Sequence, residues 1–376
     1  MCREFFFRAS FFVLVFGQSV LAGEQLFIQP GFEAPAKKSG EIIEGVRSDL
    51  SSPGLSIAVG KDGKLVWAQG FGYADVKKKE AVLINTRFRV GSIAKAITSV
   101  AIGKLVEEGK LDLDEPIKTY VPYWPKKRHP ITVRQLAGHL AGIRHYRGGE
   151  YHNTKHYDTV KEAVGVFQNS SLLFRPGTEF NYSSWGYVLI SAALEGASGE
   201  SFVRYMDQEI FKPLGMKDTL ADDPRRDDPQ LASFYHAYDR RASEVSFVNN
   251  SVKIAGGGIL STPRDLVIMS NRLTAGTFLK KETWALLTES QKLEDGSLAK
   301  GGYAIGWRKY HLPIKEGGKK VTLINHGGTS VGCISYLTIF PELDVVVAMT
   351  TNTEFGSAWR SFSRYTLTIA DVFDRL

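Results

Sequence analysis

The two ends of the chain carry strand patterns and the middle carries helical ones, and this distribution limits the fold more than any other feature. Near the start, residues 55–59 and 64–68 flank the turn Lys61-Asp62-Gly63 and predict an antiparallel hairpin. A helical pattern at 39–50 precedes it. Strand patterns return near the other end, at 303–310, 321–325, 332–340 and 345–350, before a last helix near 357–373. The expected fold is α/β (α+β), with an antiparallel sheet formed by both chain ends and flanking helices.

The middle of the chain is predicted to be mainly helical. Its most periodic segment begins at Ser92, has an apolar stripe from Ile93 to Leu105 and is followed by Gly109 at the place of a helix C′ residue. Further helical patterns lie at 133–140, 184–197, 202–211 and 262–273. We therefore expect one domain over residues 23–376, with a sheet region at 40–91 plus 300–376 and a helical region at 92–299.

The composition indicates a folded protein and argues against nucleic-acid binding. Apolar residues make up 43% and charged residues 23% of the chain, as in an average soluble protein. The 47 Lys and Arg exceed the 40 Asp and Glu by a net charge of +7. Because this excess is spread along the chain without a long basic block, it does not predict a nucleic-acid partner.

The first 22 residues read as a secretory signal peptide. Arg3 and Arg8 precede or flank a short apolar run at 9–17, and Val20-Leu21-Ala22 fits a cleavage site. The sequence thus predicts an exported protein, periplasmic or extracellular, with no integral membrane span after cleavage. Removal of this segment takes away Cys2 and leaves Cys333 without an intramolecular partner.

Two Ser-x-x-Lys tetrads occur, Ser92 to Lys95 and Ser297 to Lys300, and their contexts differ. Ser92 begins the most periodic helix, so the Lys95 amine lies one turn away on the same face and can reach the hydroxyl. Ser297 lies among loop residues that fix no such geometry. The alternative for Ser92 is an ordinary N-cap serine, which the local pattern favours about equally.

Other apparent motifs are weaker. Ser330 stands in a G-x-S-x-G pattern, but every histidine precedes it and the flanking pattern is strand, turn, strand, so an α/β-hydrolase is not expected. The glycines at 256–258 read as a turn rather than a phosphate-binding loop. We interpret four histidines as residues of a polar loop with no ligand role, namely His139, His145, His152 and His156. No metal or cofactor is therefore predicted.

Two further segments could assist a serine nucleophile. Tyr182 precedes the helical pattern at 184–197, and Ser184 could hydrogen-bond the lysine amine. A tyrosine can share proton transfer if nearby cations stabilise its phenolate, although at such a place it can equally be a packing residue. Asn325-His326-Gly327-Gly328-Thr329 lies between two strand patterns, where the glycines would let a substrate approach the backbone. A plain turn is the alternative.

The ordered set Ser92-x-x-Lys95, Tyr182-x-Ser184 and His326-Gly327-Gly328 resembles the three motifs of the serine β-lactamase and penicillin-binding-protein superfamily, in its class C-like branch. The segments 53–56, 70–75, 109–114, 137–143 and 257–266 resemble its framework. The sequence of residues 142–146 is most similar to that of the serine β-lactamase-like peptidases of animal mitochondria and their bacterial relatives.

The resemblance implies an acyl-enzyme on Ser92, with Lys95 and Tyr182 exchanging the proton. It also implies an oxyanion hole formed by the backbone N–H groups of Ser92 and Thr329. The superfamily often has Asn and Lys where this chain has Ser184 and His326. Because histidine is mostly neutral above pH 6.5 or so, we expect a weaker preference for carboxylate-bearing substrates.

The leading hypothesis is therefore an exported serine hydrolase that acts on a peptide or small-molecule substrate, most plausibly as a peptidase. An esterase, or a β-lactam or D-Ala-D-Ala hydrolase, is the alternative within enzymes. A non-catalytic binding or assembly protein on the same fold is the alternative of another class.

Overall fold

The structure is a computed structural model that describes residues 24–238, 241–314, 318–354 and 359–374. The predicted signal peptide at 1–22, including Cys2, lies outside these residues. Within them, Cys333 is a free, buried cysteine. No helix of the described part has the length and apolar character needed to cross a membrane.

The central sheet joins the two ends of the chain. Its strand order is β1-β3-β2-β13-β12-β11-β10, and neighbouring strands are antiparallel. The strands are β1 (Leu26–Ile28), β2 (Gly54–Lys61), β3 (Lys64–Asp75), β10 (Arg308–Pro313), β11 (Lys320–Ser330), β12 (Cys333–Phe340) and β13 (Val345–Thr351), with β4 (Glu80–Ala81) paired to β3. Ala58 of β2 lies opposite Ala348 of β13. The predicted fold class, with a sheet built from both chain ends, is confirmed.

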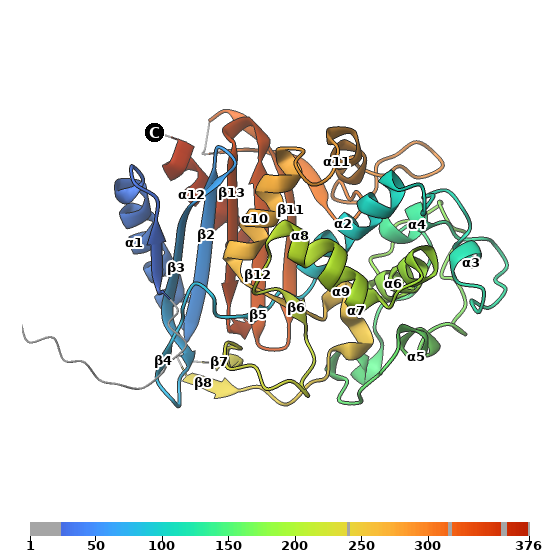
Figure 1. Ribbon diagram of the computed structural model, residues 1–376, viewed down its shortest axis with the longest axis horizontal. Coiled ribbons are helices and arrows are strands. Elements are labelled where there is room, and N and C mark those ends of the chain that lie inside the picture. Colours follow the sequence, from blue (N-terminus) through green and yellow to red (C-terminus); the bar gives the residue numbers. More distant parts are fainter. Residues whose placement is uncertain (1–23, 239–240, 315–317, 355–358, 375–376) are drawn as a thin grey trace, which may run out of the picture.

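Helices cover both faces of this sheet (Figure 1). On one face lie α1 (Glu33–Asp49) and α12 (Trp359–Asp374), and on the other lie α10 (Pro263–Thr274) and α2 (Ile93–Glu107). Alternate residues of β2 divide between the faces: Ile57 and Val59 join the core under α1 and α12, whereas Ala58 joins the larger core on the α2 side. Since β2 is buried on both faces, its sequence is almost continuously apolar.

The middle of the chain forms the helical region beside the sheet (Figure 1). Its other helical segments are α3 (Ile117–Tyr120), α4 (Val133–Ala137), η1 (Gly148–His152), α5 (Val160–Gly165), α6 (Ser184–Ser198), α7 (Phe202–Tyr205), the π-helical η2 (Met206–Phe211), α8 (Lys212–Leu214), η3 (Ser251–Lys253), α9 (Ile254–Gly257) and α11 (Lys281–Thr288), and η4 (Pro341–Leu343) lies between β12 and β13. Thr262 caps α10 and Thr132 caps α4 through their side chains.

Two small sheets lie outside the central sheet. β5 (Phe88–Arg89), β9 (Ile259–Ser261) and β6 (Leu220–Ala221) form one small sheet. β14 (Thr353–Glu354), β7 (Tyr235–Tyr238) and β8 (Arg241–Glu244) form another. Strands of two to four residues are too short to show a period, so sequence patterns carry little information about them.

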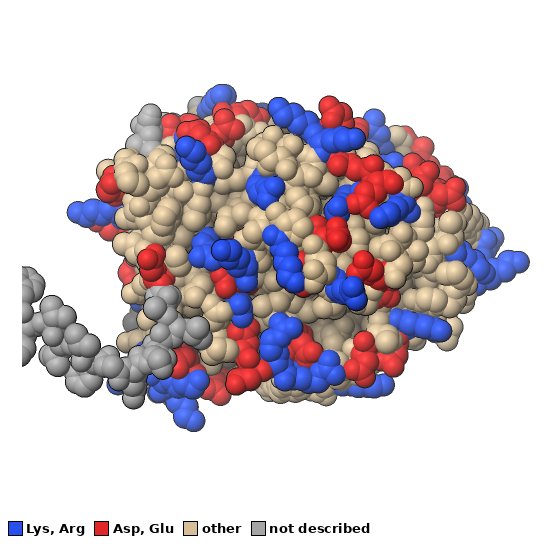
Figure 2. Space-filling view, in the orientation of Figure 1, with Lys and Arg blue, Asp and Glu red and all other residues tan. Residues whose placement is uncertain are grey.

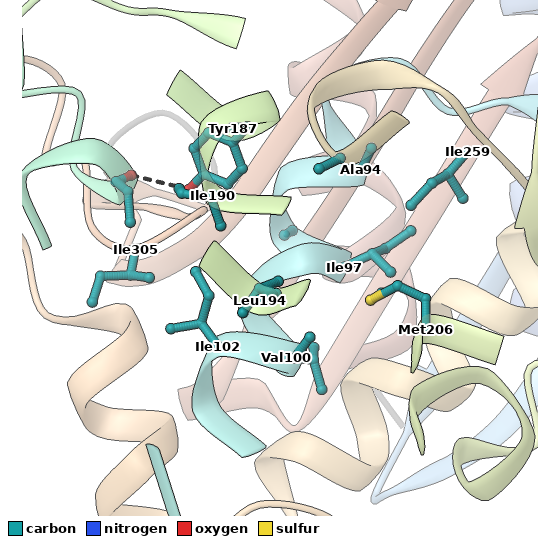
Figure 3. Close-up of a cluster of buried hydrophobic side chains, with 14 of the residues drawn as sticks. Ala94, Ile97, Val100, Ile102, Tyr187, Ile190, Leu194, Met206, Ile259 and Ile305 are labelled. Atoms are coloured by element: carbon teal, nitrogen blue, oxygen red, sulfur yellow. Dashed lines mark hydrogen bonds between the residues drawn. The ribbon is translucent and has the colours of Figure 1, made fainter. Parts of the chain in front are cut away.

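α2 lies at the centre of the larger core. Its residues Ile93 to Ile102 are all buried, so it is apolar around its whole circumference rather than along one stripe. Figure 3 shows Ile97 and Val100 of α2 among side chains from α6, η2 and β9, including Leu194, Met206 and Ile259. Because α2 is packed on every side, Ser92, the residue immediately before it, has a fixed position.

Several predicted boundaries shift in the structure. The prediction of a strand at 303–310 is wrong for the first part of that range, because β10 begins only at Arg308. The chain turns before it at Gly306, whose φ is +78° and where a Cβ would come within 2.5 Å of the Lys95 carbonyl oxygen. The helix expected at 133–140 ends at Ala137, since His139 takes a left-handed φ of 63°. α1 begins at Glu33, six residues before the predicted start.

Charged side chains of both signs are mixed over the visible face of the molecule (Figure 2). Some of the charged side chains of the molecule form ion pairs, such as Lys104 with Glu108 and Arg134 with Asp114. The net charge of +7 is therefore not gathered into one basic surface on this face.

Candidate active site

Ser92 lies at the N-terminus of α2 and its hydroxyl does not cap the helix. Instead, Nζ of Lys95 lies 3.1 Å from Oγ of Ser92. The same amine lies 3.1 Å from Oγ of Ser184 and 2.6 Å from the carbonyl oxygen of Gly256 in α9. Between the two interpretations that the sequence left open for Ser92, the geometry favours the lysine partner over the N-cap.

The Lys95 side chain is fully buried, and its burial holds the pKa of the amine well below the ordinary value for lysine. A neutral amine has two hydrogens and one lone pair. The Gly256 carbonyl can only accept a hydrogen bond and the Ser184 hydroxyl can also accept one, so both hydrogens have partners. The lone pair is then left for the hydroxyl proton of Ser92, which is the arrangement that a general base needs.

Tyr182 comes from the segment before α6 and hydrogen-bonds Ser92 from another side. Ser183 caps α6 by accepting a 3.0 Å bond from the Gly186 N–H, which fixes the chain next to Tyr182. Burial raises the pKa of Tyr182 to about 12, although the Ser92 bond and the Arg308 charge oppose this shift. The phenol is therefore protonated at neutral pH and suits a proton donor, whereas the sequence argument considered a stabilised phenolate.

β11 approaches the Ser92 turn at Gly328. A Cβ on Gly328 would lie 2.0 Å from the Val90 carbonyl oxygen and 3.0 Å from the Ser92 nitrogen. A Cβ on Gly91, whose φ is +49°, would lie 2.8 Å from the Thr329 nitrogen. These approaches leave no room for a side chain at Gly91 or Gly328 and bring the backbone at 328–329 against the backbone at 90–92.

Beside the Ser92 turn, β11 has a neighbouring strand on one side only. β10 pairs with β11 only as far as Asn325, which lies opposite Arg308. Residues 326–330 pair with β12 on their other side, from His326 with Leu337 to Ser330 with Cys333. An extended substrate can therefore add to the free edge beside Gly327 and Gly328.

His326 is buried and neutral. Its Nδ1–H donates a 2.6 Å bond to the Gly327 carbonyl, so its Nε2 accepts a 3.0 Å bond from the Tyr303 hydroxyl. Burial first, and then the nearby Arg308 charge, holds the pKa of His326 well below the ordinary value. His326 thus supplies no positive charge to the site at neutral pH.

The sequence interpretation of His139 as a spare loop residue was wrong. The ring is buried 4.3 Å from the Tyr182 ring and 4.4 Å from the Tyr303 ring, centroid to centroid. Its Nδ1 accepts a 3.2 Å bond from the Ser183 N–H, and its burial holds its pKa well below the ordinary value. Its position behind Tyr182 depends on the left-handed turn that ends α4, which no sequence period reveals.

Four other contributors to the site were also missed. Gly256 offers its carbonyl to Lys95, and Tyr303 holds His326. Tyr146 and Tyr151 come from the segment around η1, where the first hydrogen-bonds Ser184 and the second hydrogen-bonds Thr329. Of these, Gly256 alone had a sequence signal, the glycine run, but that run was read as a turn.

A cavity of about 610 Å³ opens beside these groups. Its lining combines the predicted site residues with residues of β10, β12 and α12, namely Ser92, Tyr182, Arg308, Tyr310, His326, Gly327, Gly328, Thr329, Ile334, Ser335, Tyr336 and Ser363. Lys95 and Ser184 lie beneath it, in contact with Ser92 or with each other. The structure thus brings together every residue that the sequence nominated for the site.

The other motifs lie apart from this cavity. Ser297 donates a 2.6 Å bond to Asp295 in a turn, and Ser330 ends β11 opposite Cys333. His156 lies 3.4 Å from Asp158 at the surface. Among the described residues, no group of three or more His, Cys, Asp or Glu side chains is placed to hold a metal ion.

Comparison with known proteins agrees with this geometry. The family model described as beta-lactamase matches residues 41–365. The chain belongs to the β-lactamase family. The mouse serine beta-lactamase-like protein LACTB, mitochondrial, is 29% identical to it over 83% of this chain and 74% of the relative. The family and superfamily resemblance seen in the motifs is therefore confirmed.

Solved structures share the fold. An octameric penicillin-binding protein homologue from Pyrococcus abyssi superposes with a TM-score of 0.75 and 28% identity, over 89% of this chain and 76% of that one. A D-stereospecific amidohydrolase from Streptomyces sp. superposes with a TM-score of 0.68 and 25% identity, over 84% of this chain and 94% of that one. The chain is thus related to a β-lactamase-fold family of serine hydrolases.

Proposed function

We propose that this protein is a serine hydrolase that forms an acyl-enzyme on Ser92 and cleaves amide or ester bonds, with peptides as its preferred substrates. The observation that carries this proposal is the contact set of the buried Lys95 amine. Nζ lies within hydrogen-bonding distance of the Gly256 carbonyl and of the Ser184 and Ser92 hydroxyls, so in its neutral form the amine can donate to Gly256 and Ser184 and accept the Ser92 proton.

In the first step, Oγ of Ser92 attacks the substrate carbonyl carbon and its proton passes to Nζ of Lys95. The carbonyl oxygen becomes an oxyanion, which the N–H groups of Ser92 and Thr329 stabilise by hydrogen bonding. Tyr182 then gives its phenolic proton to the leaving nitrogen or oxygen as the bond to the carbonyl carbon breaks. The Lys95 ammonium restores that proton to Tyr182, so the acyl-enzyme forms with no net change in protons.

Water completes the cycle. It attacks the acyl carbon, gives one proton to the Lys95–Tyr182 pair and forms the second tetrahedral intermediate. The bond to Oγ then breaks and Ser92 takes the proton back, which releases the acid. Because Lys95 and Tyr182 both contact Ser92, their titrations are coupled, and the proton that Lys95 takes in the first step passes through Tyr182 before the cycle ends.

Peptides are favoured because an extended chain can pair with the free edge of β11 at 326–330. The likeness to an amidohydrolase also supports amide cleavage. An esterase, or a hydrolase of β-lactams or D-Ala-D-Ala, would use the same groups. A binding protein on this fold would keep the cavity but would not acylate Ser92.

The test is covalent labelling of the purified protein by a fluorophosphonate and, separately, by a β-lactam, followed by intact mass. We expect one phosphonyl adduct on wild type and none on Ser92→Ala. Ser297→Ala and Ser330→Ala, which remove the serines of the two other motifs, should label like wild type. Equal labelling of wild type and Ser92→Ala would refute the proposal. A panel of peptide amides, nitrophenyl esters and cephalosporins then identifies the preferred bond.

We also propose that the protein is exported after removal of residues 1–22. The support is the short apolar run at 9–17 next to Val20-Leu21-Ala22. N-terminal sequencing of the protein from its native source should begin at Gly23. A start at Met1, or a processed start within a mitochondrial fraction as the name of the mouse relative suggests, would contradict export.

A further inference from the structure

The chain that follows α4 holds the backbone on both sides of Tyr182. α4 packs on α6 (Figure 1), and the segment after α4 continues along the residues that lead into α6. The Asn181 N–H donates a 2.9 Å bond to the His139 carbonyl, and the Ser183 hydroxyl donates a 2.6 Å bond to the Arg144 carbonyl. Because Tyr182 lies between these two attachments, the segment after α4 sets its backbone position.

Two histidines of that segment accept the backbone N–H groups that follow Tyr182. Nδ1 of His139 lies 3.2 Å from the Ser183 nitrogen, and Nδ1 of His145 lies 3.2 Å from the Ser184 nitrogen. Both N–H groups belong to the first turn of α6, where a helix leaves its N–H groups without a backbone acceptor. The two imidazoles therefore supply acceptors that the helix itself cannot provide.

The same two rings pack against the phenol of Tyr182. The centroid of the Tyr182 ring lies 4.3 Å from that of His139, with 50° between the ring planes. It lies 5.7 Å from that of His145, which meets it edge to face at 87°. At its other end the phenol hydrogen-bonds Ser92. A change in either imidazole would therefore move the phenol relative to the nucleophile.

Both imidazoles serve as uncharged acceptors. Histidine is mostly neutral at pH 7, and a proton on Nδ1 would face a backbone N–H donor near the positive end of the α6 dipole. Neither His139 nor His145 is among the described residues that line the cavity beside Ser92. Their contacts thus suit them to fix Tyr182 rather than to touch the substrate.

We propose that His139 and His145 are positioning residues for Tyr182, which hold the backbone that follows it and so keep its hydroxyl within reach of Ser92 and the leaving group. This inference rests on the proposed function, in which Tyr182 gives its proton to the leaving atom. It gives a role to two histidines to which the sequence patterns assigned none.

Two esters of the same acid test this role: an ethyl ester and a 4-nitrophenyl ester. Nitrophenolate can leave without a proton, whereas ethoxide must be protonated as its bond breaks, so the ethyl ester depends more strongly on the Tyr182 proton. Both esters give the same acyl-enzyme, so a difference in kcat/KM between them arises in binding and acylation.

His145→Phe keeps an aromatic ring but removes the acceptor for the Ser184 N–H. It should lower the ratio of kcat/KM, ethyl over nitrophenyl, by roughly 10- to 100-fold. His145→Asn, whose Oδ1 can accept the same N–H, should keep the ratio near that of wild type. His129→Phe, the same change at a histidine that lines a different cavity, should leave the ratio unchanged. Because His145 is exposed, its variants lose little core packing, and the nitrophenyl ester reports that each is folded and active.

A double-mutant cycle shows whether the histidines act through Tyr182. His139→Phe should lower the same ratio as His145→Phe does. In a Tyr182→Phe background the proton donor is absent, so either histidine change should lower kcat/KM for the ethyl ester by less than about 2-fold. An unchanged ratio in His145→Phe, or a full further loss in the Tyr182→Phe background, would overturn the positioning role. Absence of Ser92-dependent turnover of both esters would instead refute the proposed function.

Discussion

At the scale of single residues, burial sets the chemistry of this site. Lys95 and His326 can each carry a positive charge, and burial disfavours the charged form of both. Tyr182 is affected in the opposite direction and keeps its proton. The site therefore combines an amine whose neutral form burial favours, and which can then accept a proton, with a phenol that can donate one; the cavity lining also includes the cationic Arg308. Each role follows from how deeply the side chain lies and what it contacts.

The state of Lys95 gives a pH prediction for reactivity. Only the neutral amine can accept the Ser92 proton, so the rate of fluorophosphonate labelling should rise with pH through the pKa of Lys95 and level off well below the usual lysine range. Lys95→Met should label roughly 100- to 10,000-fold more slowly, the usual contribution of a general base. The labelling rate measured over a pH series checks both. A variant that labels at the wild-type rate would exclude Lys95 as the base.

The same residue gives a prediction for stability. The pKa of Lys95 is lower in the folded than in the unfolded chain, so unfolding takes up a proton at any pH between those two values. The free energy of unfolding of wild type, relative to Lys95→Met, should therefore increase as pH rises through this window, by up to about 1.4 kcal/mol per pH unit. Urea unfolding at several pH values measures it. A difference that is constant or decreases with pH would contradict a buried neutral amine.

At the scale of secondary-structure elements, the site depends on how β11 meets the start of α2. β11 can come within contact of the Ser92 turn only because Gly328 has no side chain there. β5, which pairs with β9, delivers the chain to Gly91, and the capped N-terminus of α6 fixes Tyr182. None of these elements carries the chemistry alone. Their packing brings the backbone of β11 against the Ser92 turn and the side chains of Lys95 and Tyr182 to the Ser92 hydroxyl.

Gly328→Ala tests this contact between elements. The added Cβ would lie 2.0 Å from the Val90 carbonyl oxygen, so β11 must move away from Ser92. We expect kcat/KM to fall by roughly 100-fold, as for loss of an oxyanion-hole donor, and the free energy of unfolding to fall by about 1–3 kcal/mol. Enzyme assays and urea unfolding measure the two effects.

Gly45→Ala is the matched control, because Gly45 lies within α1 with no atom close enough to contact a Cβ. It should leave kcat/KM unchanged and raise the free energy of unfolding by about 0.5–1 kcal/mol. If Gly328→Ala kept wild-type activity, the close approach of β11 to Ser92 would not be required for catalysis.

At the scale of the whole molecule, the two ends of the chain hold each other in place. β2 pairs with β13, and α1 packs on α12 over the same face of the sheet. The Phe373 ring of α12 stacks 6.2 Å from Phe32 and 6.1 Å from Trp67, centroid to centroid. The described part of the protein contains no disulfide, since Cys333 is free. Stability therefore depends on this core and on the larger one around α2.

Phe373→Ala tests how strongly the ends are coupled. The ring is fully buried, so its removal should lower the free energy of unfolding by about 3–5 kcal/mol. Activity per folded molecule should stay the same, because the cavity beside Ser92 does not include this residue. Phe247→Ala is the control: its side chain is 60% exposed, and the change should be within about 0.5 kcal/mol. Similar unfolding curves for the two variants would contradict the role of the C-terminal helix in the core.

The sequence alone determined the fold class and the motif residues. Alternation and helical spacing are local properties of the chain, and they sufficed to predict a sheet from both ends and a helical middle. The set Ser92, Lys95, Tyr182 and His326 was also readable, because a helical turn places Ser92 next to Lys95 and the three motifs occur in a known order.

Only the tertiary structure decided the environment of those residues. The Gly256 carbonyl that receives the Lys95 amine lies 161 positions away in sequence, and Arg308 meets the third motif through a strand pairing. The position of His139 behind Tyr182 likewise arises from a left-handed turn. Burial, and with it the pKa of each group, is a property of distant segments packed together, and no local period of the chain encodes it.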